Sequence, residues 1–414
     1  MNTKNRETRT LIAALDIGTS KIVAVVAEVL PDGGGFEVIG IGQHPSRGLK
    51  RGMVINIEST VGSIQRALED AELMANVKIS DVITGIAGSH IRSFNSHGMV
   101  AIQDKEVKAS DVDRVLETAR AVSIPTDQQV LHVLTQEYII DGQDGVREPV
   151  GMSGVRMEVK VHIVTGAVSA AQNIMKCVRR CGLEVRELVL QPLASAQAVL
   201  TEDERDLGVC LVDIGGGTTD IAVFVQGAIR HTAVIPIAGD QITNDIAMAL
   251  RTPTGAAEDL KMTHGCALRQ LASASQMVDV PGVGDRGTRQ LSRHTLAEVI
   301  EPRVEELFTL IQAELRRSGF EELLSSGIVL TGGASAMSGM LELGEEIFHM
   351  PVRVGSPSYR GPLSEVARNP RFATVMGLLM SGMEQHQKSQ VLRTGISTFS
   401  QVLERMKNWF KGAF

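Results

Sequence analysis

Apolar positions near the start of the chain predict a small sheet with one helix against it. Continuous apolar runs over residues 11–15 and 22–27 predict two buried strands, and a third strand is expected before residue 43. From Glu58 to Met74 the apolar residues have the spacing of an amphipathic helix, and Asp81–Ala87 predicts a further strand. This mixture of strands and helices favours an α/β fold.

Residues 89–164 have a pattern of their own, which we interpret as an insert. A strand is expected at Gly98–Ile102, followed by a helix with its N-cap near Ser110. Apolar runs at Val130–Ile140 and Met157–Val164 predict two more strands of this insert.

Strands and helices alternate again over the rest of the chain. Apolar runs predict strands at Val185–Leu190, Val209–Val212, Ile221–Val225 and Gly327–Leu330. Helical spacing predicts helices at Ser169–Cys181, Leu193–Leu200, Gln241–Leu250, Ala256–Met262, Leu296–Arg317 and Arg371–Met383. The stretch Pro281–Arg293 is rich in Gly, Pro and Arg, so an exposed loop is expected there.

One short motif occurs twice, at Leu15–Lys21 and at Val212–Asp220. Each copy lies between two apolar runs and predicts a β-hairpin with a Gly/Thr turn. Asp16 and Asp213 then end a strand and can hold Mg²⁺ through water, while the turn offers bare N–H groups to phosphate oxygens. Two copies predict two related halves that close on one nucleotide. The candidate phosphate-side residues are Asp16, Gly18, Thr19, Ser20, Lys21, Asp213, Gly215, Gly216, Gly217, Thr218 and Thr219. Gly239 is a further candidate for nucleotide binding.

A third glycine element follows the strand at Gly327–Leu330. Its glycines, Gly332 and Gly333, allow the backbone to approach a base or ribose closely, and Ala334 follows them. The alternative is a tight turn with no ligand. Glu258 and Lys261 share a helix face and are candidates for the adenosine side, the alternative being a solvated ion pair.

Gln191 precedes Pro192 at an expected strand end. It is the candidate catalytic residue, because its amide can orient a water, although a polar residue at a strand end is commonly only a cap.

Length and composition exclude several classes of protein. The 414 residues are enough for two or more domains. The net charge is −7 and aromatic residues make up 3%, so no nucleic-acid partner is expected. The four cysteines lack the spacing of a metal site, and reduced thiols are expected. No signal peptide or membrane-spanning run is expected either.

The C-terminal residues change character. Glu384–Thr398 is polar and predicts a flexible linker. Beyond it, apolar residues at helical spacing predict an amphipathic helix that lies on a membrane surface, the alternative being a helix that docks in an apolar groove. The candidate membrane residues are Phe399, Leu403, Met406, Trp409 and Phe410.

The order of these motifs resembles the actin-like ATPase superfamily, which implies a two-lobed fold of ribonuclease-H-like halves that binds ATP with Mg²⁺. The chain is similar to the FtsA family of bacterial division proteins within that superfamily. The segments that carry this similarity are Pro45–Gly48, Gly151–Met157, Arg230–Thr232, His264–Leu268 and Leu296–Arg303.

The resemblance implies a division into parts. Those parts are a flexible arm (1–10), subdomain 1A (11–88 and 165–205), the inserted subdomain 1C (89–164), subdomain 2A (206–226 and 310–383), subdomain 2B (227–309), a flexible linker (384–398) and a membrane-targeting helix (399–414).

The resemblance also implies partners and a location. Subdomain 2B is expected to bind the acidic C-terminal peptide of FtsZ, with candidate contacts Arg286, Arg289, Arg293 and Arg303, although ordinary surface arginines are the alternative. The expected role is an adaptor at the septum that self-assembles, anchors FtsZ to the inner face of the cytoplasmic membrane and recruits other division proteins. ATP hydrolysis is expected to be weak at most. The alternatives are a sugar or small-molecule kinase, which needs a carboxylate base in the cleft, and a pilus-assembly ATPase.

Overall fold

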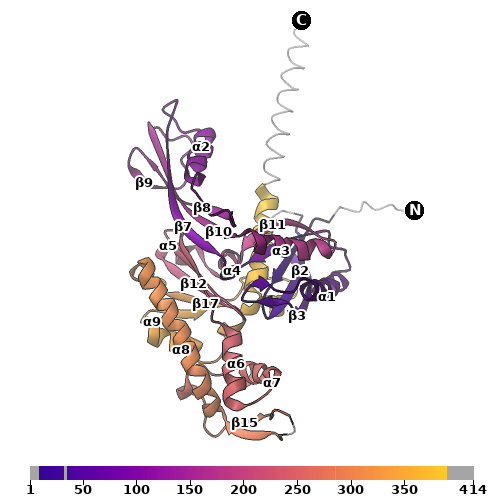
Figure 1. The fold of residues 1–414 in the computed structure, drawn as a ribbon. Helices are drawn as coiled ribbons and strands as arrows, with labels where there is room; N and C mark the ends of the chain where they lie inside the picture. The colour runs from indigo at the N-terminus through magenta and orange to yellow at the C-terminus, as the bar shows by residue number, and fades with distance from the viewer. Residues whose placement is uncertain (1–8, 32–34, 285, 389–414) are drawn as a thin grey trace, which may run out of the picture.

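Two five-stranded sheets with the same strand order form the centres of two lobes. The computed structural model describes residues 9–31, 35–284 and 286–388. The insert projects from one end of the molecule, and residues 239–292 form the other end (Figure 1).

The repeated motif opens an equivalent strand pair in each sheet. The first sheet has the order β11-β6-β1-β2-β3 and the second the order β14-β13-β12-β17-β18. In each sheet, the three strands that come first in the sequence run antiparallel to one another in turn. The two later strands run parallel to the first strand. The predicted two related halves are therefore confirmed. The first sheet comprises β1 (Leu11–Ile17), β2 (Lys21–Val29), β3 (Phe36–Pro45), β6 (Asp81–Ile86) and β11 (Glu184–Leu190). The second comprises β12 (Val209–Ile214), β13 (Thr219–Val225), β14 (Ala228–Ile235), β17 (Ile328–Thr331) and β18 (Val352–Val354).

Helices cover the first sheet as the apolar spacing predicted. Helix α1 (Ile57–Ala75) begins at Asn56, whose side chain accepts from the Ser59 N–H. Its side chains Ile64 and Ala67 are buried in the core that covers this sheet. Helix α3 (Val168–Arg180) packs into the same core. The predicted strands and helices of this lobe are thus confirmed.

Helix α4 (Gln191–Val199) lies between the lobes. Ala194 and Ala198 belong to the core on the first sheet, whereas Ala196 and Val199 belong to the core of the second. A helix over residues 373–388 also packs on the first sheet, through Val375 and neighbouring residues. It begins two residues later than predicted.

The far end of the second lobe is mostly helical. It contains α6 (Gly239–Leu250), α7 (Thr254–His264), α8 (Arg293–Ser318) and the hairpin of β15 (Met277–Val280) and β16 (Arg289–Ser292). The prediction of a loop over Pro281–Arg293 was therefore wrong at its end, because Arg289–Ser292 pairs with β15.

The insert is a four-stranded sheet in the order β7-β10-β8-β9 with one helix. Its elements are β7 (Arg92–Ala101), α2 (Ala109–Arg120), β8 (Gln128–Ile140), β9 (Gln143–Val146) and β10 (Arg156–Ala167). Strand β7 is longer than predicted, and β9 was not predicted. The cap near Ser110 was wrong, since the N-cap is Lys108, whose N–H donates to Asp111.

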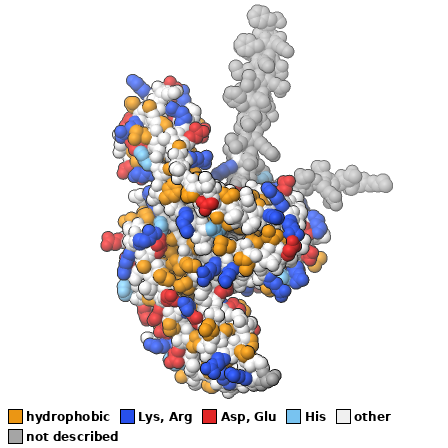
Figure 2. All heavy atoms as spheres, viewed as in Figure 1, with side chains coloured by type: hydrophobic (Ala, Val, Ile, Leu, Met, Phe, Trp, Pro, Cys, Tyr) orange, Lys and Arg blue, Asp and Glu red, His pale blue; other side chains and the backbone are white. Residues whose placement is uncertain are grey.

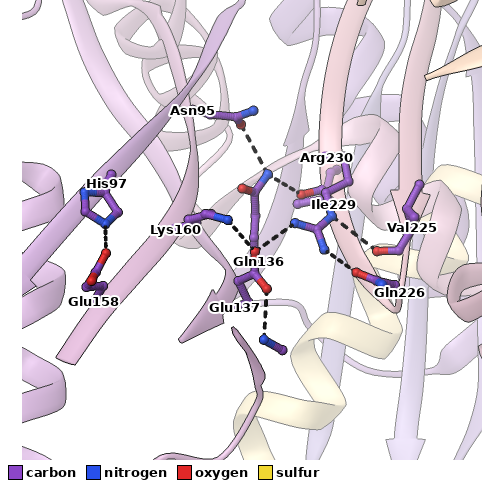
Figure 3. A network of polar contacts seen from close by, with 11 residues as sticks. Asn95, His97, Gln136, Glu137, Glu158, Lys160, Val225, Gln226, Ile229 and Arg230 are labelled. Atoms are coloured by element: carbon purple, nitrogen blue, oxygen red, sulfur yellow. Dashed lines mark hydrogen bonds and ion pairs between the residues drawn. The ribbon is translucent and has the colours of Figure 1, made fainter. Parts of the chain in front are cut away.

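A polar seam joins the insert to strand β14 of the second lobe (Figure 3). The Gln136 amide donates to the Ile229 carbonyl at 2.9 Å and to Asn95 at 3.2 Å. The Glu137 carboxylate accepts from Lys160 at 2.9 Å and lies 3.9 Å from the Arg230 guanidinium. The insert also contacts the first lobe, where the Leu190 N–H donates to His132 at 2.9 Å.

The remaining elements are short. They are β4 (Leu49–Lys50), β5 (Met53–Val54), α5 (Glu202–Leu207), α9 (Met340–Phe348), α10 (Ser364–Ala367) and the 3₁₀ turns η1 (Arg269–Leu271), η2 (Glu321–Leu323), η3 (Gly333–Ala336) and η4 (Pro370–Phe372).

The C-terminal predictions lie partly outside the described residues. Residues 384–388 of the predicted linker continue the last helix, and the predicted membrane residues lie beyond residue 388. Among the helices that the structure describes, none combines the length and apolar character needed to cross a bilayer.

Candidate functional site

The two motif copies form turns with the same geometry. The Gly18 N–H donates to the Lys21 carbonyl at 3.1 Å, and the Gly215 N–H donates to the Thr218 carbonyl at 3.0 Å. A Cβ added at Gly18 would lie 2.9 Å from the Lys21 carbonyl oxygen, closer than Cβ atoms come to other atoms. Each turn therefore joins its two strands through one backbone hydrogen bond, and Gly18 has no room for a side chain.

These turns lie against each other, and both line one cavity. A Cβ on Gly217 would lie 2.8 Å from the Thr19 Oγ1 atom, and one on Gly216 would lie 2.8 Å from the Ser20 Cβ atom. The cavity has a volume of about 290 Å³. It is lined by the predicted residues Asp16, Gly18, Thr19, Ser20, Lys21, Gln191, Asp213, Gly215, Gly216, Gly217, Thr218, Gly239, Glu258, Lys261, Gly332, Gly333 and Ala334.

Thr219 is the predicted residue that lies away from the cavity. Its side chain is fully buried, and its hydroxyl donates to the Ile237 carbonyl at 2.7 Å. Thr219 therefore fixes the start of β13.

The two motif aspartates are buried and held by side-chain donors. The Gln191 amide donates to Oδ1 of Asp16 at 3.0 Å, and the Ser195 hydroxyl donates to Oδ2 of Asp213 at 2.5 Å. Burial raises the pKa of Asp16 to about 6, although Lys21 opposes this. Burial also raises the pKa of Asp213, and the Ser195 hydroxyl opposes that rise. Burial lowers the pKa of Lys21 to about 7, against the effect of Asp16. In each case burial disfavours the charged form, and the nearby opposite charge or hydrogen bond offsets only part of that effect.

Asp220 is a further buried carboxylate of the site that the motif did not single out. Its Oδ2 atom accepts from the Thr218 hydroxyl at 3.1 Å, and its Oδ1 atom has no hydrogen-bond partner in the described chain. Burial raises its pKa to about 7, with a further contribution from Asp213.

The third glycine turn closes the cavity against Asp213. Gly332 has φ +86° and ψ 170°, and a Cβ there would lie 2.4 Å from Oδ1 of Asp213 and 2.5 Å from the Ile214 carbonyl oxygen. This position therefore requires glycine.

Glu258 and Lys261 do not form a solvated pair. The Lys261 ammonium donates to Glu258 at 2.6 Å, to the Thr243 hydroxyl at 2.8 Å and to the Gly239 carbonyl at 3.1 Å. All three of its protons are thus used within the protein. Lys261 anchors α7 to α6, and only Glu258 keeps acceptor capacity toward a ligand.

Several lining residues were missed because no local pattern marks them. They include Gly52, Asp240, Met262, Met337, Asn369, Arg371 and Thr374. Gly52 joins the site through its N–H, which donates to the Thr19 hydroxyl at 3.0 Å. Only a three-dimensional arrangement brings these residues together.

The four candidate arginines lie outside this cavity, and three have partners within the chain. Arg289 donates to the Leu250 carbonyl and Arg293 to the His264 carbonyl. Arg303 pairs with Asp245, with N–O distances of 2.5 and 3.1 Å. The exposed Arg286 makes no hydrogen bond or ion pair with the residues that the structure describes.

Two family models match the chain. The model described as "Cell division protein FtsA" matches residues 210–377, and "SHS2 domain inserted in FTSA" matches residues 88–165. The cell division protein FtsA of Pseudomonas aeruginosa is 62% identical over 410 residues, which cover 98% of each chain. This chain belongs to the FtsA family. The FtsA of Escherichia coli K12 is 46% identical over 415 residues, covering 98% of this chain and 99% of that protein.

Solved structures support the predicted actin-like fold. A chain of the PilM–PilN type IV pilus biogenesis complex has a TM-score of 0.66 at 17% identity, covering 90% of this chain and 98% of its own. MreB5 of Spiroplasma citri bound to AMPPNP has a TM-score of 0.56 at 16% identity, covering 94% and 99%. The predicted family, its insert and its fold are thus confirmed, and FtsA membership favours a cell-division role over the kinase and pilus alternatives.

Proposed function

We propose that this FtsA-family chain binds ATP with Mg²⁺ between its two glycine turns. The observation that carries the proposal is the adjoining pair of glycine turns, each closed by the same backbone hydrogen bond, because the backbone N–H groups of such turns suit phosphate oxygens. The solved MreB5 structure of the same fold carries AMPPNP, which supports a nucleotide of this class.

The carboxylates of the cavity fit Mg²⁺. Asp16 and Asp213 each accept side-chain hydrogen bonds at one oxygen, Oδ1 and Oδ2 respectively. Their other oxygens can hold the hydrated ion, because Mg²⁺ prefers oxygen ligands and keeps several waters beside substrate phosphates. When bound, the ion offsets phosphate charge, and Lys21 adds a cation near the same position. The Gln191 amide nitrogen donates to Asp16, which leaves its carbonyl oxygen able to orient a water. We propose that hydrolysis is weak at most, because an adaptor needs the nucleotide mainly to set its conformation.

We propose that residues 227–309, the expected subdomain 2B, bind the acidic C-terminal peptide of FtsZ. Figure 2 shows Lys and Arg side chains gathered at the β15 end of the molecule. Arg286 supports this surface best, since its guanidinium makes no bond within the described chain. Arg286→Glu is expected to weaken peptide binding in a fluorescence-polarisation titration. Equal affinity for parent and variant would remove Arg286 from the surface.

We also propose a peripheral attachment to the cytoplasmic membrane through residues 399–414. One such helix binds reversibly, and self-assembly would multiply its effect by ~10²–10⁴ through avidity. Trp409→Glu is expected to abolish co-sedimentation with anionic vesicles, and a variant that still pellets would refute the membrane role of the tail.

The whole function is tested by pelleting the full chain with FtsZ, vesicles and ATP. FtsZ is expected in the vesicle pellet with the full chain, and in the supernatant when residues 399–414 are removed. FtsZ that pellets equally in both cases would contradict the anchoring role.

A further inference from the structure

Helix α4 holds both motif aspartates on one face. Gln191, in its first turn, donates to Asp16 at 3.0 Å, and Ser195, one turn later, donates to Asp213 at 2.5 Å. Asp16 belongs to the first lobe and Asp213 to the second. Residues four positions apart lie above one another on a helix. The helix that packs on both sheets is therefore also hydrogen-bonded to the carboxylate of each lobe.

A second helix reinforces the Asp213 end of this arrangement. The Thr374 hydroxyl, from the helix over residues 373–388, lies 3.3 Å from Oδ2 of Asp213 and 3.1 Å from the Ser195 hydroxyl. Oδ2 thus accepts from hydroxyls of both helices, and Gly332 lies against Oδ1. The two hydroxyls thus hold the carboxylate through its Oδ2 atom.

Ser195 places a hydroxyl among the small apolar side chains of α4. Its neighbours toward the two cores, Ala194, Ala196 and Ala198, are alanines, and Ser195 itself is fully buried. A buried hydroxyl has to find a partner, and here that partner is the carboxylate that faces the cavity.

We infer that Ser195 and Thr374 are positioning residues for a Mg²⁺-bound nucleotide, fixing the rotamer of Asp213, while α4 sets the spacing between Asp213 and Asp16. This inference rests on the proposed nucleotide site. Mutation of a residue that hydrogen-bonds a metal-binding carboxylate typically lowers metal affinity about 10–100-fold. The same contacts link the spacing of the carboxylates to the angle between the lobes, since α4 contacts both sheets.

The test is the Mg²⁺ dependence of ATP binding to the full chain, measured by titration in Mg²⁺ and in EDTA. Ser195→Ala and Thr374→Val each remove one hydroxyl, on different helices. Thr374→Ser keeps the hydroxyl and serves as the conservative variant. Ser63→Ala is the matched control. Ser63 is a buried serine of α1, far from Asp213 in the fold, and its hydroxyl accepts from the Arg47 N–H.

We expect Ser195→Ala and Thr374→Val to need about 10–100-fold more Mg²⁺ for half-maximal ATP binding. Their affinity for ATP in EDTA should stay within about twofold of the parent, and Thr374→Ser and Ser63→Ala should match the parent in both conditions. Unchanged Mg²⁺ dependence in both hydroxyl-removing variants would overturn the inference. An equal loss with and without Mg²⁺ would also overturn it, since it would indicate a merely structural role. A parent chain that binds no ATP would instead overturn the proposed nucleotide site.

Discussion

Gly332→Ala is the substitution that the site should tolerate least. The backbone at Gly332 has φ +86° and ψ 170°, a region that is essentially confined to glycine. An alanine Cβ would also lie 2.4 Å from Oδ1 of Asp213 and 2.5 Å from the Ile214 carbonyl oxygen. One of these contacts is backbone and cannot rotate away, so the turn and Asp213 have to shift.

The expected cost has two parts. The backbone strain is worth about 1–3 kcal/mol, and forcing an extra methyl into a packed site typically costs about 1–3 kcal/mol. Even the lower values together destabilise the fold by about 2 kcal/mol, roughly a thirtyfold change in the folding equilibrium. Displacement of Asp213 should also abolish Mg²⁺-dependent ATP binding.

The assay is urea denaturation followed by circular dichroism, without nucleotide. Gly62→Ala is the control, because Gly62 lies within α1 and a Cβ there meets nothing within 4 Å. This control should gain about 0.5–1 kcal/mol, since glycine is unfavourable inside a helix. If Gly332→Ala unfolds at the same urea concentration as the parent, the described conformation of this turn is wrong.

Two further predictions concern buried polar groups. Asp220→Asn should reduce the dependence of the unfolding free energy on pH. In the folded chain the pKa of Asp220 is raised from 3.8 to about 7. The protonated carboxyl therefore stabilises the fold fully below pH 3.8, and this contribution is lost as the pH rises through 7. Between pH 5 and 8 in EDTA, the parent should therefore lose about 2–3 kcal/mol more unfolding free energy than the variant, and parallel pH profiles would contradict this. In the seam between the insert and β14, Gln136→Leu should cost about 1–3 kcal/mol, because it leaves the Ile229 carbonyl unpaired. The control is Arg147→Ala, which removes an exposed ion pair with Asp206 and should cost at most about 1 kcal/mol of unfolding free energy. If Gln136→Leu and Arg147→Ala lower the unfolding free energy equally in urea denaturation, the seam is not a buried contact.

Apolar patterns along the chain were enough to predict most of the sheet-forming strands and long helices. Strands such as β1 and β12 are continuous apolar runs because both faces of the sheet are covered. The misses have local causes. Strand β9 is short and polar, and α2 takes its cap from a backbone N–H that donates to Asp111 rather than from the hydroxyl of Ser110.

The candidate site was predictable only where chemistry repeats in the sequence. The two glycine turns could be matched to each other, and they lie against each other in the structure. Ser195 and Thr374 carry no such signal, because they lie 179 positions apart and meet only through the packing of two helices. The Glu258–Lys261 pair was found from its spacing, but its burial depends on α6, which no spacing rule reveals.

The claim that one ATP lies between the glycine turns can be tested by photolabelling the full chain with 8-azido-ATP in Mg²⁺. Labelled peptides are then located by mass spectrometry. We expect label on peptides that line the cavity near Glu258 and Gly333, such as those containing Met262 or Met337. Excess ATP should remove this label. Label confined to peptides outside the cavity, or label that excess ATP does not displace, would contradict the claim.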